Sequence, residues 1–191
     1  MPRPCASLRD TAAARRDGLL LEQRFPHLSH GPFLLGSIDA SAGRDTSAER
    51  WLALALQRDP GDTEALRLYP MVLFRLGRAT AAAAEFGRYF TLTHAESWDW
   101  AMLYYWALCL ESLGQDREAL VAFDRATQIR PQLAEAWIEF AYTLAATRDS
   151  TIRDTAHARS ALAQGLRYAD LKDVALRARV AAVRAAIGQK R

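Results

Sequence analysis

The sequence predicts an all-α protein in which paired helices stack into a solenoid. Three observations indicate this class. Apolar residues recur every three to four positions from about residue 47 onward. Few glycine and proline residues mark the tight turns that join strands. The segment that begins at Ala134 also aligns without a gap with the one that begins at Ala95, 39 residues earlier, and repeats of this length made of paired helices indicate a solenoid.

The composition suits one soluble globular unit. The chain has 191 residues, of which 50% are hydrophobic and 25% charged, and its net charge is +3. Charged residues interrupt the first twenty positions, so we expect no secretory signal. The uncharged segment at residues 100–110 is shorter than the roughly 20 residues of a membrane span. Only Cys5 and Cys109 are present, so we expect a cytoplasmic protein without disulfides or a thiolate metal site.

Residues 1–45 are predicted to form an irregular N-terminal segment with one short helix over residues 10–23. Turn-forming residues are frequent after that helix, which predicts a loop. They are Pro26, Gly31, Pro32, Gly36 and Gly43. The apolar stretch at residues 31–38 leaves an alternative open, in which it lies in a groove of the repeats as a built-in plug.

The repeats are predicted within residues 46–170. Trp98 in one copy aligns with Trp137 in the next, and we expect both, together with Trp106, to lie in the core because of their repeat positions. The first copy is partial and is predicted as a single helix. The boundaries of the partial copy and the three complete copies are 46–62, 63–94, 95–133 and 134–170.

This pattern resembles the tetratricopeptide repeat, whose helix pair carries a glycine at the turn and alanine, phenylalanine, alanine and proline along the second helix. The matching positions are Gly77, Ala82 and Phe86 in one copy and Gly114, Ala119, Phe123, Ala126 and Pro131 in the next. The resemblance covers roughly residues 46–170. It implies a right-handed α-α superhelix that binds other proteins, with the first helix of each pair on the concave side.

Two departures from the family's pattern are expected to alter the structure. Pro70 stands inside a first helix, where a proline removes a hydrogen bond and produces a kink. The later two copies exceed the family's usual 34 residues by about five. We assign the additional residues to longer first helices or to loops, most clearly at residues 147–155.

Residues 171–191 break the repeat and are predicted to form a capping helix and a tail. One face of this helix is apolar and is expected to pack on the last repeat; it consists of Leu176, Val180, Val183 and Ile187. The basic residues towards the C-terminus are expected on the solvated outer face, so we do not favour nucleic acid as a partner. They are Arg167, Lys172, Arg177, Arg179, Arg184, Lys190 and Arg191.

The first helices are predicted to carry the binding site. At about 100° per residue, one stripe of the segment at residues 100–113 packs against neighbouring helices and consists of Leu103, Trp106, Leu110 and Leu113. The opposite faces of the first helices form a candidate concave groove made of Leu68, Met71, Arg75, Tyr104, Leu108, Glu135, Glu139 and Tyr142. Such a patch is typical of an interaction surface for an amphipathic or extended peptide. The alternative is that Tyr104, Leu108 and Tyr142 pack between helices.

No motif for catalysis, cofactor binding or metal binding is present. His27 and His30 lie three positions apart without an adjacent carboxylate, and we interpret them as a loop pair. We therefore expect a non-enzymatic adaptor or scaffold, without a cofactor, that binds a protein or peptide. The alternative is a cytoplasmic chaperone similar to the three-repeat chaperones of type III secretion translocators. Homo-oligomerisation and a role as a subunit of a larger enzyme also stay open.

Overall fold

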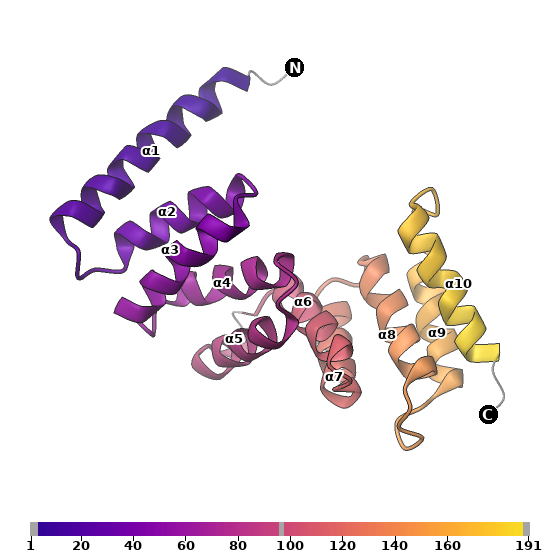
Figure 1. Ribbon diagram of the computed structural model, residues 1–191. Helices are drawn as coiled ribbons and strands as arrows, with labels where there is room; N and C mark the ends of the chain where they lie inside the picture. Colours follow the sequence, from indigo (N-terminus) through magenta and orange to yellow (C-terminus); the bar gives the residue numbers. More distant parts are fainter. Residues whose placement is uncertain (1–3, 96–97, 189–191) are drawn as a thin grey trace. The chain divides into compact units, whose positions relative to one another are not determined.

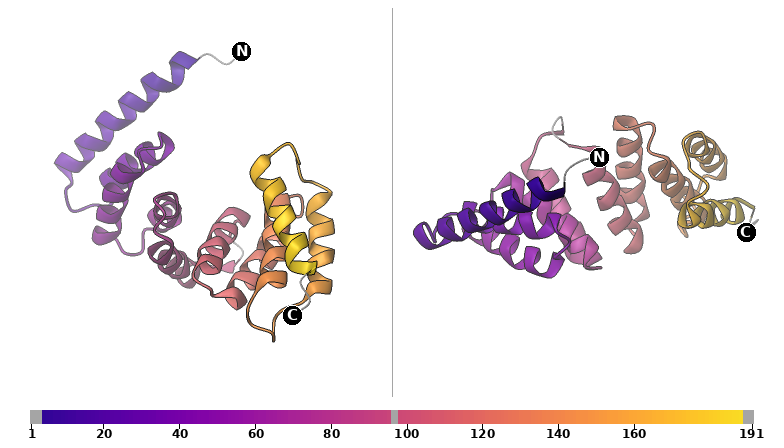
Figure 2. Two further views of the ribbon diagram at one scale, coloured as in Figure 1. Left: turned by 45° about the vertical axis from the view of Figure 1, so that its right-hand side comes forward. Right: turned by 90° about the horizontal axis from the view of Figure 1, so that it is seen from above.

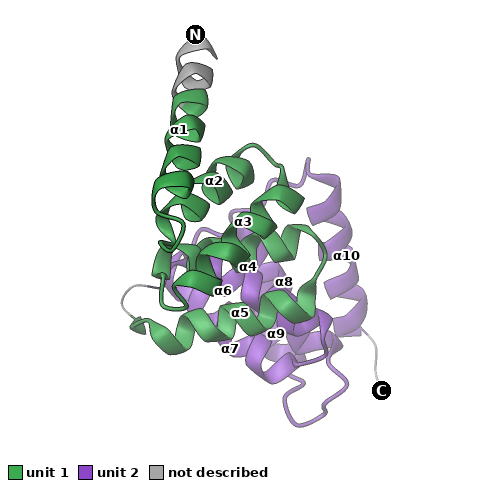
Figure 3. Cartoon of the chain, turned by 60° about the vertical axis from the view of Figure 1, so that its left-hand side comes forward, with its two compact units in different colours: residues 1–96 green, residues 97–191 purple. Residues whose placement is uncertain are grey.

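The computed structural model describes residues 4–95 and 98–188. Within these ranges the chain forms ten α-helices and no strand (Figure 1), which confirms the predicted all-α class. The chain divides into two compact units, residues 1–96 and 97–191 (Figure 3). Among the described residues, no helix is both long and apolar enough to cross a membrane.

The first unit contains five helices, and consecutive helices within it pack on one another. They are α1 (Pro4–Arg24), α2 (His30–Ser41), α3 (Asp45–Arg58), α4 (Thr63–Arg75) and α5 (Ala79–Leu92). Helix α2 also contacts α4, as expected when successive helix pairs stack on one another. Pro70 lies inside α4 and is buried.

The predicted loop over residues 24–45 is wrong, because α2 occupies most of it. Pro32 lies in the first turn of α2, where a missing backbone N–H costs nothing. Gly36 permits close packing, since a Cβ there would lie 2.8 Å from Leu52 Cγ of α3. Leu35 is fully buried, so the stretch at residues 31–38 is part of the core of this unit rather than a plug.

Helices α2 and α3 form a complete helix pair, so the predicted partial copy at residues 46–62 is only the second half of a repeat. The three turns inside α2–α3, α4–α5 and α6–α7 contain Gly43, Gly77 and Gly114, with φ of 70°, 73° and 72°. Only glycine adopts this conformation without strain. In each turn the following residue donates its N–H to the carbonyl five positions earlier, as Arg78 does to Leu73 at 3.0 Å.

A buried carboxylate joins three helices of the first unit. Asp39 of α2 is fully buried and accepts hydrogen bonds from Arg15 of α1 at 2.5 Å, from Arg44 at 2.7 Å and from Ser47 of α3 at 2.5 Å. Burial alone would raise the pKa of Asp39, but these hydrogen bonds outweigh it and lower the pKa. The ionised carboxylate therefore stabilises the packing of α1, α2 and α3.

The second unit also contains five helices. They are α6 (Trp100–Ser112), α7 (Asp116–Ile129), α8 (Ala134–Ala146), α9 (Thr155–Leu166) and α10 (Val174–Gly188). Helices α6–α7 and α8–α9 form two pairs, and α10 packs on α8 and α9 (Figures 1 and 2). Val180 and Val183 of α10 are buried in the core, with Leu176 and Ile187 partly buried beside them. The predicted apolar face of the capping helix is confirmed.

The predicted core stripe of α6 is only partly correct. Leu103 and Leu110 are buried, but Leu113 is 39% exposed because the helix ends at Ser112. Trp106 and Trp137 are partly buried against the core rather than inside it. Trp98 is also only partly buried, and the guanidinium of Arg125 lies 4.8 Å from the centre of its ring.

Candidate functional site

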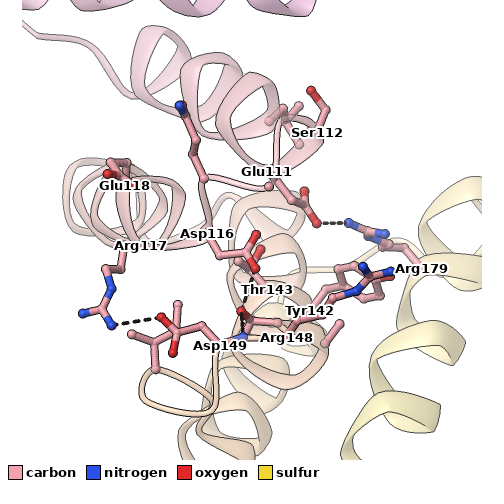
Figure 4. A pocket seen from close by; sticks show the side chains of 16 residues that line it. Glu111, Ser112, Asp116, Arg117, Glu118, Tyr142, Thr143, Arg148, Asp149 and Arg179 are labelled. Carbon is pink, nitrogen blue, oxygen red and sulfur yellow. Dashed lines mark hydrogen bonds and ion pairs between the residues drawn. The ribbon is translucent and has the colours of Figure 1, made fainter.

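The second unit contains a pocket of about 970 Å³ at the ends of its helix pairs (Figure 4). Its walls come from the C-terminal halves of α6 and α8, the turn that leads into α7, the loop at residues 147–154, and one arginine of α10. A pocket of this size holds several side chains of a ligand.

The loop at residues 147–154 is the insertion that the repeat length predicts. Thr147 donates a hydrogen bond through Oγ1 to Asp116 Oδ2 at 2.6 Å, and Arg117 donates to Asp149 Oδ2 at 2.9 Å (Figure 4). Asp154 then caps α9 by accepting from the backbone N–H groups of its first turn. These contacts hold the loop against the start of α7, where it forms a wall of the pocket.

The pocket has an apolar side formed by Leu108 of α6, Tyr142 of α8 and Ile152 of the loop. All three side chains are partly buried. Leu108 and Tyr142 pack against the core and keep the rest of their surface towards the pocket. This side can therefore contact an apolar side chain without a rearrangement of the helices.

Next to Tyr142 lies a charged cluster of Glu111 (α6), Glu139 (α8) and Arg179 (α10), which we call the Glu–Arg cluster. Arg179 donates through Nη2 to Glu111 Oε1 at 2.7 Å and through Nε to Glu139 Oε2 at 2.6 Å. Its guanidinium lies 3.5 Å from the ring centre of Tyr142 (Figure 4). The prediction that Arg179 lies on a solvated outer face is wrong, because α10 packs on α8 with this residue towards the pocket.

The two carboxylates of the Glu–Arg cluster share one arginine. Burial raises the pKa of Glu111 to about 7; Arg179 lowers it and the neighbouring Glu139 raises it further. Burial likewise raises the pKa of Glu139, with Arg179 opposing the change. One guanidinium therefore does not compensate for the burial of two carboxylates, and Glu111 changes its charge near neutral pH.

The structure brings some of the predicted contact residues of this unit together and separates others. Leu108 and Tyr142 line the pocket, and Glu139 lies beside it through its bond to Arg179. Tyr104 packs against the core instead, with its ring centre 6.1 Å from that of Phe123. Glu135 is exposed in the first turn of α8, outside the lining of the pocket.

The other three predicted contact residues belong to α4 of the first unit. Leu68 and Met71 are partly buried there. Arg75 donates through Nε to Asp45 Oδ1 at 2.9 Å and through Nη2 to the carbonyl of Ala40 at 3.3 Å. Its guanidinium is thus engaged in holding α4 against the start of α3.

Sequence reasoning missed Arg179 and the polar residues of the turn into α7. Arg179 lies 40 and 68 positions from its partners Glu139 and Glu111, a separation that no local pattern reveals. The additional length of the later repeats did indicate the loop at residues 147–154, which forms a wall of the pocket. Within the described residues, no group of three or more histidine, cysteine, aspartate or glutamate side chains could hold a metal ion.

Solved structures share the fold of this chain at low sequence identity. YrrB, described as a TPR protein with an unusual peptide-binding site, is 16% identical, with 88% of this chain and 82% of YrrB covered at a TM-score of 0.71. A MamA structure is 18% identical, with 85% and 91% covered and a TM-score of 0.69. MamA from Desulfovibrio magneticus RS-1 is 14% identical, with 86% and 88% covered and a TM-score of 0.68.

No protein-family model and no curated protein sequence matches the chain. At identities of 14–18% the likeness to solved structures concerns the fold alone. It confirms the predicted stacking of helix pairs.

Proposed function

We propose that this chain, a tetratricopeptide-like repeat protein, is a non-enzymatic interaction module that binds a peptide or helix of a partner protein in the pocket of its second unit. One observation carries the proposal: Leu108 and Tyr142, which come from different repeats and which helix periodicity assigns to the open faces, line the same pocket. YrrB, which has the same fold, is described as having a peptide-binding site, and this supports the proposal by analogy.

The composition of the pocket suits a peptide better than a small apolar molecule. Its lining combines apolar side chains, which can accept one or two side chains of a ligand, with charged groups at the turn into α7 and with Glu111 and Arg179 of the Glu–Arg cluster. An apolar centre with a polar rim is the usual arrangement of an interface between proteins. A bound segment would bury Leu108, Tyr142 and Ile152.

The low number of cysteines, two in the whole sequence, fits a binding module in a reducing compartment, and we keep the cytoplasm as the proposed location. Cys109 is free and buried in α6, and burial raises the pKa of its thiol to about 11. A thiol with this pKa is protonated at neutral pH and is a poor nucleophile.

The proposal is tested by filling the pocket. Ala146 is exposed at the end of α8 and lines the pocket, so Ala146→Trp fills it without removing a core contact. Ala163 is exposed on α9 and lies outside the lining, so Ala163→Trp is the matched control. Peptides are selected with the wild-type protein from a phage-displayed random library, and their affinities for all three proteins are measured by calorimetry.

We expect Ala146→Trp to weaken binding at least tenfold, which corresponds to about 1.4 kcal/mol, and Ala163→Trp to leave it within twofold. Circular dichroism verifies that both variants keep their helices. Equal affinities for the wild type and Ala146→Trp would show that the pocket is not the binding site. Failure to select any peptide would contradict the proposed function itself.

A further inference from the structure

We propose that the pocket selects partner segments that carry a positively charged side chain, and that this charge binds beside Arg179 to the carboxylates of the Glu–Arg cluster. The inference rests on the proposed function, because it names the chemistry of the ligand for the same pocket. It is carried by three features: the unused oxygens of the cluster, the balance of charge around the pocket, and the apolar side chains that line the same pocket.

In the Glu–Arg cluster, one oxygen of each carboxylate accepts no hydrogen bond from Arg179. Among the described residues, the bonds to Arg179 use Oε1 of Glu111 and Oε2 of Glu139. The second oxygen of each carboxylate is left for another donor. Two carboxylates and one guanidinium also carry a net charge of −1 when all three are ionised. A lysine or arginine of a partner supplies both the missing charge and the missing hydrogen-bond donors.

The remaining charges around the pocket favour the same ligand. Asp116 and Glu118 lie at the start of α7 and line the pocket with Glu111. Three arginines line the same pocket: Arg117 is paired with Asp149, Arg179 belongs to the cluster, and Arg148 is exposed in the loop. The lining thus holds four carboxylates, those of Glu111, Asp116, Glu118 and Asp149, against three guanidiniums, and Glu139 adds one carboxylate beside it. This excess of negative charge favours a basic segment over an acidic one.

The apolar side fits the stem of a basic residue. Lysine and arginine side chains place three or four methylene groups along apolar surface and keep the charged end in a polar environment. Leu108 and Ile152 are available for the stem, while Glu111 lines the same pocket. An apolar neighbour of the basic residue would occupy the rest of this side.

Because Glu111 is buried, binding of the basic side chain is linked to loss of a proton from the Glu111 carboxyl group. The charged groups that face Glu111 are Arg179 of α10, Glu139 of α8 and Asp116 of α7, and the pKa of Glu111 is about 7. A cation bound beside Glu111 favours its ionised form and lowers that pKa. Binding therefore releases protons near pH 7, and the affinity for a basic peptide rises as the pH increases through 7.

The test compares the wild type with Glu111→Gln, which keeps the size and the acceptor of Glu111 but removes its charge. Both proteins select peptides from the same phage-displayed random library. We expect arginine or lysine to be enriched at one position with the wild type and not with Glu111→Gln. Replacing that arginine by citrulline, which has the same shape without the charge, should weaken binding to the wild type at least tenfold and to Glu111→Gln less than threefold.

Glu135→Gln is the control for a general effect of charge, since Glu135 is exposed on α8 and lies outside the lining of the pocket. We expect it to change affinity less than threefold. Affinity for the basic peptide should increase severalfold from pH 5.5 to pH 8 with the wild type and by a clearly smaller factor with Glu111→Gln, in which Glu139 is the remaining carboxylate of the cluster. Peptides that bind in the pocket without a basic position, or with an acidic one, would overturn the inference and leave the proposed function intact. Selection of no peptide would overturn both.

Discussion

Glu111→Gln is expected to stabilise the second unit at pH 8 and to have little effect at pH 5. The pKa of Glu111 in the folded protein, about 7, is above its ordinary value of 4.5. The folded state therefore binds the proton more tightly than the unfolded state. The resulting stabilisation is fully present below pH 4.5 and is lost as the pH rises through 7. Glutamine, which stays uncharged, avoids this loss.

The magnitude follows from the difference between the two pKa values. A difference between 4.5 and about 7 corresponds to about 3 kcal/mol of free energy. The Glu111 side chain keeps 16% of its surface exposed, and Arg179 loses a charged partner in the variant, so both effects reduce the gain. We expect the free energy of unfolding at pH 8 to increase by about 1 to 2 kcal/mol.

Urea unfolding followed by tryptophan fluorescence measures this change. Four of the five tryptophans belong to the second unit, so the signal reports mainly on that unit; they are Trp98, Trp100, Trp106 and Trp137. Glu118→Gln, an exposed change at the same pocket, should stay within about 0.5 kcal/mol of the wild type. If Glu111→Gln were equally destabilising at pH 5 and pH 8, Glu111 would act as an ordinary ion-pair partner and the argument from burial would be refuted.

Three further substitutions test the packing within each unit. Asp39→Asn removes the charge that two arginines share, and should destabilise the first unit by about 2 kcal/mol at pH 7. Because the pKa of Asp39 is lowered, the wild type should lose the same stabilisation as the pH falls below 3.8. Gly165→Ala places a Cβ 2.9 Å from Ile138 Cγ1 and should cost about 1 to 3 kcal/mol. Gly87→Ala, whose Cβ meets nothing within 4 Å, should instead stabilise α5 by about 0.5 to 1 kcal/mol.

Thermal and urea unfolding curves measure these changes. An Asp39→Asn variant as stable as the wild type at pH 7 would mean that the carboxylate does not join the three helices. Equal effects of Gly165→Ala and Gly87→Ala would mean that α8 and α9 do not approach each other as closely as the structure has them.

The second helices of the repeats were predictable because their pattern reports directly on burial. Ala119 and Phe123 of α7 are fully buried, as is Phe86 of α5. Gly77 and Gly114 adopt the positive φ that the turn inside each pair requires. At such positions only one kind of side chain fits, so the residue type identifies the structure.

Helix α2 was not predictable from the same kind of signal because glycine has two uses. Gly31 and Gly36 were interpreted as loop residues, but each lies where a Cβ would meet a neighbouring helix at 2.9 and 2.8 Å. Close packing and chain reversal both require glycine, and local sequence does not distinguish them. The informative signal was the spacing of Gly43 and Gly77. They stand 34 residues apart, and 34 residues is the usual length of this repeat.

The pocket was only half predictable. Helix periodicity assigned Leu108 and Tyr142 to open faces because it identifies the faces of single helices, and both residues line the pocket. It misplaced Tyr104, because a lone helix gives no information on where the next helix, with Phe123, begins to cover it. The position of the Arg179 side chain in the pocket depends on how α10 packs on α8. This packing is a property of the folded unit and leaves no local pattern in the sequence.

The central claim, that the second unit binds a peptide in its pocket, is tested most directly by nuclear magnetic resonance. A selected peptide is titrated into the ¹⁵N-labelled protein, and the backbone amide shifts are mapped. The account predicts the largest shifts at residues 108–118, 142–152 and around Arg179, the segments that line the pocket. Shifts confined to the first unit, or to the exposed face of α9, would contradict it.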